Sequence, residues 1–325
     1  MRIGVMIGPE RGDTASKAAR MVDDVVWAES AGLDTAWIPQ VPGDFDALTA
    51  IALMGAGTNR IELGTAVVPL QAQHPMTLAR QALSVHAATG GRLTLGIGPS
   101  HRYIVQDMLG LPYDKPVAYT RDYLEVLMPA LRGAESVAVG NATFTVRHPL
   151  DLTPVAPLTV MTAALAPMML RLAGEQADGT ILWMADDRAV AEHIAPRITR
   201  AATEAGRPAP RIVAGLPICL CRQTDVDAAK ARANRILGVD ETLPNYRRLL
   251  EHGNADNIGD LCLAGDEDAI VTGLRRYAAA GATDVSVRLL PLGDNRATLT
   301  ASKHRTRQMI ADIADELRGT TTVSR

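Results

Sequence analysis

Short apolar segments with strand character alternate with helix-like segments along almost the whole of this 325-residue chain. The strand-like segments are residues 3–7, 35–38, 61–68, 93–98, 158–163, 179–183, 211–221 and 283–289. Helical spacing of apolar residues is found at residues 14–31, 45–55, 76–88, 119–131, 167–173, 188–205, 225–237, 267–280 and 298–317, and more loosely at 244–260. Such alternation is typical of a parallel sheet covered by helices.

Eight strand-like units, each followed by a helix, predict an α/β fold of the (β/α)8 TIM-barrel type. A doubly wound open sheet is the alternative, but no Gly-x-Gly-x-x-Gly turn follows the first strand. We expect a single barrel domain over residues 1–318 and a disordered tail over residues 319–325. Residues 134–157 alternate around Gly140-Asn141 and predict a hairpin excursion from the barrel.

Composition narrows the classes of partner. The net charge is −3 and no basic stripe with interleaved aromatic residues occurs, which argues against nucleic-acid binding. We find no secretion signal and no apolar run of membrane-spanning length, so we expect a cytoplasmic protein. The three cysteines are too few and too irregularly spaced for a disulfide framework or a zinc site, and we expect buried thiols and no metal.

The segment from Ile61 to Leu70 is the most informative candidate for a site. Its apolar, β-branched run contains Gly64-Thr65, remains apolar up to Pro69, and is followed by His74-Pro75 at the start of a new helical pattern. In parallel α/β proteins, ligands bind at the carboxyl ends of the strands. A smooth apolar surface at such a position suits a flat aromatic cofactor.

Three segments carry a resemblance to a known family: residues 63–69 with His74-Pro75, residues 91–98, and residues 163–166 with 173–179. Together, in this order, they resemble the bacterial luciferase-like superfamily, and within it the oxidoreductases that depend on the deazaflavin coenzyme F420. The resemblance implies a barrel, a homodimer and a small-molecule substrate. It also implies a non-proline cis peptide at Ala66–Val67 that backs the middle ring of the deazaflavin.

The same resemblance implies a set of cofactor-binding residues at the strand ends. Residues 163–166 would hold the coenzyme phosphate at a helix N-terminus, although Leu165 departs from the glycines that are usual there. For both segments a structural role is the alternative to cofactor binding. Residues 66–68 would then be part of the barrel core, and residues 163–166 would be a helix start rich in small residues. The implied set is Gln40, Ala66, Val67, Val68, Gly98, Pro99, Ser100, Ala163, Ala164, Leu165, Ala166, Trp183 and Met184.

One histidine is the candidate for proton transfer. His101 stands where sugar-phosphate dehydrogenases of this group have a carboxylic acid, and a histidine donates or accepts protons near neutral pH. Gln40-Val41 replaces the Asp-His pair of that branch, so alcohol oxidation by the same arrangement is excluded. A loop histidine without a catalytic role is the alternative for His101. We expect structural roles for His74 and His86.

We therefore expect an F420-dependent oxidoreductase that transfers a hydride between the deazaflavin and a small organic substrate, most simply by reducing an activated C=C, C=N or C=O bond. An FMN-dependent luciferase-like monooxygenase is the first alternative. A barrel that binds the deazaflavin without catalysis is the second.

Overall fold

A computed structural model describes residues 1–8, 13–238 and 243–319 of the chain. The predicted disordered tail lies outside the described residues except for Gly319, the last residue of helix α11. None of the described helices is both long enough and apolar enough to cross a membrane.

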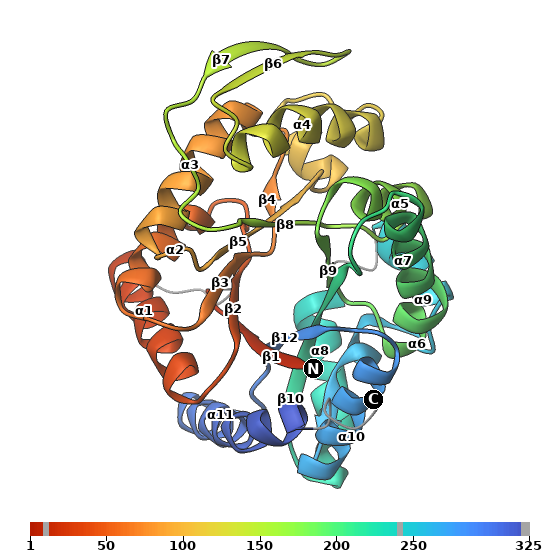
Figure 1. The fold of residues 1–325 in the computed structure, drawn as a ribbon. Coiled ribbons are helices and arrows are strands. Elements are labelled where there is room, and N and C mark those ends of the chain that lie inside the picture. The colour runs from red at the N-terminus through yellow and green to blue at the C-terminus, as the bar shows by residue number, and fades with distance from the viewer. Residues whose placement is uncertain (9–12, 239–242, 320–325) are drawn as a thin grey trace.

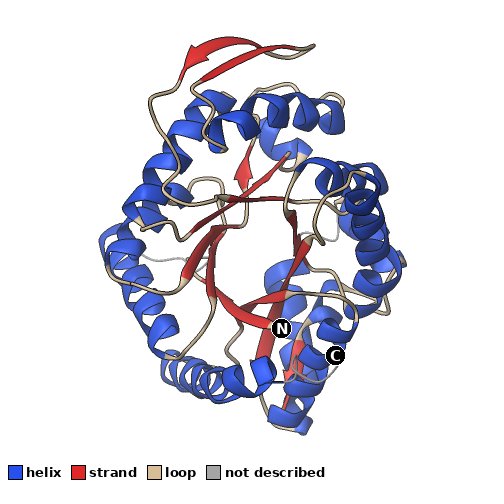
Figure 2. Ribbon diagram, in the orientation of Figure 1, coloured by secondary structure: helices blue, strands red, loops and turns tan. Residues whose placement is uncertain are grey.

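Eight parallel strands close into a barrel, as the sequence predicts (Figures 1 and 2). Each strand pairs with its neighbour in chain order, and the circle is closed because β12 pairs with β1. The eight strands are β1 (Arg2–Met6), β2 (Thr35–Ile38), β3 (Glu62–Thr65), β5 (Leu93–Gly98), β8 (Thr159–Thr162), β9 (Gly179–Trp183), β10 (Arg211–Leu220) and β12 (Asp284–Leu289).

Helices surround the barrel on the outside (Figure 2). The α-helices are α1 (Thr14–Ser30), α2 (Ala47–Ala56), α3 (Pro75–Ala88), α4 (Pro116–Leu131), α5 (Pro167–Gln176), α6 (Asp187–Ala189), α7 (Ala195–Glu204), α8 (Val226–Leu237), α9 (Pro244–Glu251), α10 (Glu267–Ala279) and α11 (Arg296–Gly319). The described residues also form two π-helical segments, η1 (Tyr103–Met108) and η2 (Val190–Ile194), and two 3-10 turns, η3 (Gln223–Asp225) and η5 (Ile258–Leu261).

The structure corrects the predicted elements in four places. The strand predicted at 61–68 is two strands, because β3 ends at Thr65 and β4 (Val68–Pro69) pairs separately with β5. The helix predicted at 188–205 is divided by η2, and η1 lies between the strand predicted at 93–98 and the helix predicted at 119–131, where no element was predicted. The short strand β11 (Leu263–Gly265), which extends the sheet beside β10, was not predicted.

The predicted excursion is confirmed as an antiparallel hairpin, β6 (Ser136–Gly140) with β7 (Thr145–Pro149). It lies outside the ring of helices, next to α4 (Figure 1). Asn141 anchors its turn, since the amide Nδ2 donates to the carbonyl of Asp122 on α4 at 3.0 Å. The hairpin therefore adds to the outer surface and leaves the barrel circuit intact.

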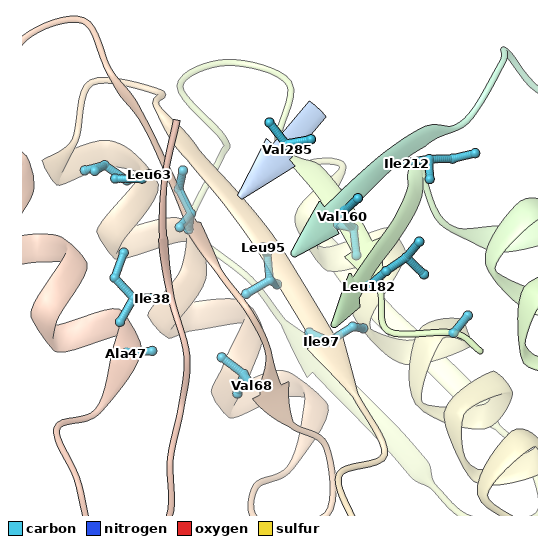
Figure 3. Packing of buried hydrophobic residues seen from close by; sticks show 14 of the residues in the cluster. Ile38, Ala47, Leu63, Val68, Leu95, Ile97, Val160, Leu182, Ile212 and Val285 are labelled. Carbon is cyan, nitrogen blue, oxygen red and sulfur yellow. The ribbon is translucent and has the colours of Figure 1, made fainter. Parts of the chain in front are cut away.

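Alternation along the strands divides their side chains between two surfaces. The outward-facing residues form one large apolar cluster with the helices, to which Leu63, Leu95, Val160, Leu182 and Ile212 belong (Figure 3). The inward-facing residues form a separate cluster of Trp37, Met161, Ile181 and Val213 inside the barrel. The barrel interior is thus a packed core and not a channel.

Trp37 is the largest side chain of this inner core and is fully buried. Its indole Nε1 donates to Thr35 Oγ1 at 2.9 Å, so the one polar group of the ring is satisfied. Space for the ring depends on Gly64 of the adjacent strand, because a Cβ there would lie 2.3 Å from Trp37 Cε3.

Ionised side chains close the amino-terminal end of the barrel. Arg211 bridges Glu62 at 3.0 Å and Asp284 at 2.6 Å, and Arg2 contacts the same two carboxylates. Burial acts to raise the pKa of Glu62, but the attraction of Arg211 and Arg2 outweighs it and the pKa is lowered. The amino-terminal end is therefore occupied by ion pairs, and any ligand must enter at the opposite end.

The substitution Gly64→Ala tests the packing around Trp37. The added methyl group cannot fit beside the indole, so we expect the free energy of unfolding to fall by about 1–3 kcal/mol in chemical denaturation. Gly140→Ala is the control, because a Cβ at Gly140 meets nothing within 4 Å. Equal stability of the two variants would contradict the proposed role of Gly64.

Candidate active site at the carboxyl ends of the strands

The predicted segments at the ends of β3, β5 and β8 converge. A Cβ on Gly98 would lie 3.0 Å from Val67 Cγ2 and 3.0 Å from Ala163 Cβ, so these three residues are in contact. The peptide bond between Ala66 and Val67 is cis, which confirms that expectation. We call the open end of the barrel lined by Ala66, Gly98, Ala163 and Trp183 the barrel mouth.

Small and apolar side chains give the barrel mouth its character. Ala66 and Val67 pack against the inner core below them and are half-buried, as is Ala163. Trp183 continues the inward face of β9 and lies against β10, because a Cβ on Gly215 would be 2.9 Å from Trp183 Cε3. A flat apolar ligand therefore finds a surface with few polar groups to desolvate.

Not every predicted cofactor residue presents its side chain to the barrel mouth. The side chains of Val68, Ala164 and Met184 are at most 2% exposed and belong to the outer apolar core. These three residues can reach a ligand only through their backbone.

The backbone itself is unusual at two of the predicted positions. Ser100, two residues after β5, has φ +57°, and Met184, directly after β9, has φ +60°. Residues other than glycine rarely adopt this left-handed conformation, and such residues cluster at functional sites. The Ser100 carbonyl is fixed by the Tyr113 hydroxyl, which donates to it at 2.9 Å. Between Gly98 and Ser100, Pro99 is half-buried.

Gln40 has a structural role in addition to any role toward a ligand. Its Oε1 accepts from the backbone N–H of Ala47 at 3.1 Å, which orders the loop before α2. Val41, the next residue, is 43% exposed. Neither side chain can act as a base near neutral pH, in agreement with the exclusion of the Asp-His arrangement.

His101 is half-buried between two aromatic rings. Its imidazole is stacked on Tyr103 with centroids 5.9 Å apart, and Tyr246 of α9 approaches at the same centroid distance with a tilt of 49°. These contacts fix the imidazole next to the loop that follows Gly98.

The other two histidines considered from the sequence have the expected structural roles. His74 Nδ1 accepts from Met76 N–H at 3.2 Å and caps α3. His86 is fully buried with Nε2 3.0 Å from the carbonyl oxygen of Ala156.

The loop Ala163–Ala166 ends at the N-terminus of α5. Ala166 occupies the capping position without a side-chain hydrogen bond, and Pro167 is the first helical residue. The first N–H groups of a helix have no intrahelical acceptor, and together with the helix dipole they favour an anion. Leu165 is half-buried, and its carbonyl oxygen lies 2.8 Å from His193 Nε2.

His193 fixes this loop and was not singled out from the sequence. It lies in η2, is 4% exposed, and stacks on His252 with ring centroids 4.0 Å apart. Burial lowers the pKa of His193; the Leu165 carbonyl opposes this effect, and the neighbouring His252 and Arg197 reinforce it. A neutral His193 therefore donates from Nε2 to Leu165.

The segment from Tyr246 to Asn254 connects several loops around the barrel mouth. Tyr246 contacts His101, His252 stacks on His193, and the Asn254 N–H donates to Asp186 Oδ2 at 2.5 Å. Asp186 also caps α6 through Ala189 N–H at 2.7 Å. Sequence spacing gives no signal for these contacts, because His193 and His252 are far apart along the chain.

The thiols and potential metal ligands offer no alternative site. The three cysteines are free; Cys219 and Cys262 are buried, and burial raises the pKa of Cys219 to about 12. Within the described part of the chain, no group of three or more His, Cys, Asp or Glu residues is placed to hold a metal ion.

Comparison with known proteins agrees with this arrangement. A model of the luciferase-like monooxygenase family matches residues 1–284. A protein named as a coenzyme F420-dependent oxidoreductase, Rv3520c of Mycobacterium tuberculosis, is 31% identical over 196 residues. That match covers 55% of this chain and 54% of the relative, so it spans about half of each protein.

Solved structures share the fold. The coenzyme F420-dependent tetrahydromethanopterin reductase of Methanopyrus kandleri superimposes with a TM-score of 0.75 at 21% identity, covering 95% of this chain and 97% of the reductase. The oxygenating constituent of 3,6-diketocamphane monooxygenase from Pseudomonas putida, solved with FMN, gives 0.74 at 17% identity and covers 96% and 98%. The fold is therefore common to proteins that use either cofactor.

The role of His193 is tested by His193→Phe, which retains a ring beside His252 and removes the hydrogen bond to Leu165. Loss of this hydrogen bond should cost about 0.5–1.5 kcal/mol of local stability, which predicts roughly two- to thirteenfold faster amide exchange in residues 163–170 by mass spectrometry. The control is His304→Phe, at an exposed position on α11. Unchanged exchange in His193→Phe would contradict the assignment.

The lowered pKa of His193 predicts that the stability of the protein depends on pH. The pKa of His193 in the folded protein lies below the ordinary value of 6.5. The stability that neutral His193 contributes to the folded state is therefore complete above pH 6.5 and is lost as the pH falls through the lowered pKa. Acidification below pH 6.5 should therefore destabilise the native protein more than His193→Phe. Identical pH dependence of unfolding in both proteins would be evidence against a depressed pKa.

Proposed function

This chain belongs to the luciferase-like monooxygenase family, and we propose that it is an oxidoreductase that uses coenzyme F420. The proposed reaction is hydride transfer between the deazaflavin and a small organic substrate, with reduction of an activated C=C, C=N or C=O bond as its direction. The observation that carries this proposal is the contact of Val67, Gly98 and Ala163 at the barrel mouth, next to the N-terminus of α5.

The residues at the barrel mouth fit a flat ring system. Ala66, Val67 and Ala163 present small apolar groups, and Gly98 has no Cβ that would fill the space between Val67 and Ala163. Trp183 at the end of β9, the strand next to β8, presents a large apolar face. These residues would hold the rings by contact and by exclusion of water, with little desolvation of polar groups.

The start of α5 fits the phosphate that connects the ring system to the rest of the coenzyme. The backbone N–H groups of this helix N-terminus would bind the phosphate, and the small side chains of Ala163 and Ala166 let it approach closely. Fixation of the Leu165 carbonyl by His193 holds this loop in one conformation. Preorganisation of this kind reduces the ordering cost of binding.

The bound coenzyme supplies the hydride, and the protein supplies orientation and one proton. We assign that proton to His101, because imidazole is the side-chain group that ordinarily exchanges protons near neutral pH. Contacts with Tyr103 and Tyr246 limit the positions of the imidazole. Hydride addition to an unsaturated bond requires one proton in addition to the hydride, so one positioned donor is sufficient.

An FMN-dependent monooxygenase remains the competing assignment, because a neighbour with the same fold was solved with FMN. Both cofactors present a flat tricycle and a phosphate, so the barrel mouth accepts either in principle. The chain is 31% identical over 196 residues to a relative named as F420-dependent, and 17% identical to the neighbour solved with FMN. This difference supports the deazaflavin.

Equilibrium titration with oxidised F420 and with FMN, in the same buffer, tests the cofactor. We expect micromolar or tighter binding of F420 and much weaker binding of FMN, measured by cofactor absorbance and tryptophan fluorescence. Ala163→Leu should weaken F420 binding at least tenfold, because its side chain fills the barrel mouth. Ala205→Leu, at the exposed position directly after α7, is the control. Preference for FMN would overturn the F420 assignment.

His101→Ala tests the proton donor once enones and imines have been screened for turnover with reduced F420. Loss of general acid catalysis predicts a fall in kcat of about 100-fold or more with the F420 dissociation constant unchanged. Tyr103→Phe retains the stacked ring and should keep most of the activity. A small effect of His101→Ala together with a large effect of Tyr103→Phe would transfer the role to Tyr103. If F420 binds and no acceptor is reduced, the chain is a binding protein and not a reductase.

A further inference from the structure

A large cavity opens at the same end of the barrel as the barrel mouth and has no role in the site described so far. Its volume is about 1380 Å³, above the roughly 300–1,000 Å³ of typical small-molecule pockets. It is lined by the carboxyl ends of β1 and β12 and by the loop after β2, which are neighbours in the barrel. Helices α1 and α11, which lie side by side around the barrel in Figure 1, form its outer walls.

The charge of the cavity is opposite to that of the chain. Among the described residues that line it, six cationic side chains and three carboxylates give an excess of three positive charges, whereas the chain as a whole carries −3. The cationic residues are Lys17, Arg20, Arg232, Arg288, Lys303 and Arg307. A cavity with an excess of one sign of charge concentrates ligands of the opposite sign.

Ion pairs hold several of these cations in the cavity wall. Lys17 pairs with Asp44, while Arg307 and Lys303 share the single carboxylate of Asp24. The guanidinium of Arg307 also lies 4.4 Å from the ring centroid of Trp27. Arg307 and Lys303 are therefore held beside the same carboxylate.

Two arginines extend the positive surface from α1 to α8. Arg20 is exposed on α1 and has no ion pair or hydrogen bond with another described residue. Arg232 on α8 is half-buried, and its Nε donates to the carbonyl of Pro291 at 2.8 Å. This bond directs the guanidinium to the cavity wall, where bidentate contacts with a carboxylate or phosphate become possible.

The cavity lies at the same end of the barrel as the barrel mouth. Arg288 is two residues beyond Ser286 and four beyond Asp284, so it continues the inward face of β12 toward the barrel mouth. Val41 lines the cavity and directly follows Gln40, one of the residues predicted at the barrel mouth. A ligand with its reactive part in the barrel mouth can therefore extend a second part into the cavity.

We propose that this cavity binds the anionic end of the hydride acceptor, so that the substrate is a carboxylate- or phosphate-bearing molecule with its unsaturated bond at the barrel mouth. The assignment to the acceptor rests on the proposed function, whereas the anion site itself does not. The glutamyl tail of F420 is a second source of the same chemistry, and competition between the ligands distinguishes the two.

Isothermal titration with inorganic pyrophosphate at constant ionic strength, without coenzyme, tests the anion site. We expect saturable binding, weakened roughly tenfold or more in the double variant Arg20→Gln/Arg232→Gln. The matched control is Arg200→Gln, an exposed helical arginine whose side chain is 72% exposed and which is not part of the cavity. Absence of saturable binding, or equal weakening by Arg200→Gln, would overturn the anion site.

Tryptophan fluorescence locates the bound anion. Trp27 lines the cavity, so pyrophosphate should change the emission of the native protein and have a much smaller effect on Trp27→Phe. A change in emission that persists in Trp27→Phe would place the anion elsewhere and contradict the proposal.

Titration of F420 in the presence of saturating pyrophosphate shows whether the cavity receives the hydride acceptor or the glutamyl tail of F420. If the cavity receives the acceptor, the two ligands bind independently and the F420 dissociation constant is unchanged. If pyrophosphate competes with F420 in the native protein and this competition is lost in Arg20→Gln/Arg232→Gln, the cavity binds the coenzyme tail and the inference about the substrate is wrong. Failure of the protein to bind F420 while pyrophosphate still binds would overturn the proposed function and leave the anion site intact.

Discussion

The packing of Trp37 inside a closed barrel is the constraint on which the rest of the structure depends. The indole fills the middle of the barrel only because Gly64 of the neighbouring strand has no side chain. Ion pairs among Arg2, Glu62, Arg211 and Asp284 occupy the amino-terminal end. Because the described residues fill the middle and the amino-terminal end of the barrel, a ligand is expected at the carboxyl ends of the strands.

Small side chains at that edge turn a packed barrel into a candidate binding site. Val67, Gly98 and Ala163 come from three separate segments and meet because parallel strands bring their carboxyl ends to one edge. Long-range contacts then fix the surrounding loops: His193 holds Leu165, and Tyr246 contacts His101. The rigid barrel and the contacts between loops together determine the positions of the groups to which we assign binding and proton transfer.

Much of the fold and part of the site could be predicted from the sequence, for identifiable reasons. Local apolar periodicity marks all eight barrel strands, and closure then places Gly98 and Ala163 at one edge. The contacts of His193 with Leu165 and His252 link segments that are distant along the chain, so no local pattern signals them. The three-residue strand β11 is too short for periodicity to be detected. The basic cavity likewise depends on the packing of α1 against α11.

A crystal structure of the protein with oxidised F420 tests the central claim most directly. Our account predicts the ring system at Ala66, Val67, Gly98 and Ala163, with the phosphate at the N-terminus of α5. It also predicts that the cavity between α1 and α11 contains no part of the coenzyme. Coenzyme bound away from the barrel mouth, or a phosphate distant from Ala163–Ala166, would contradict the account.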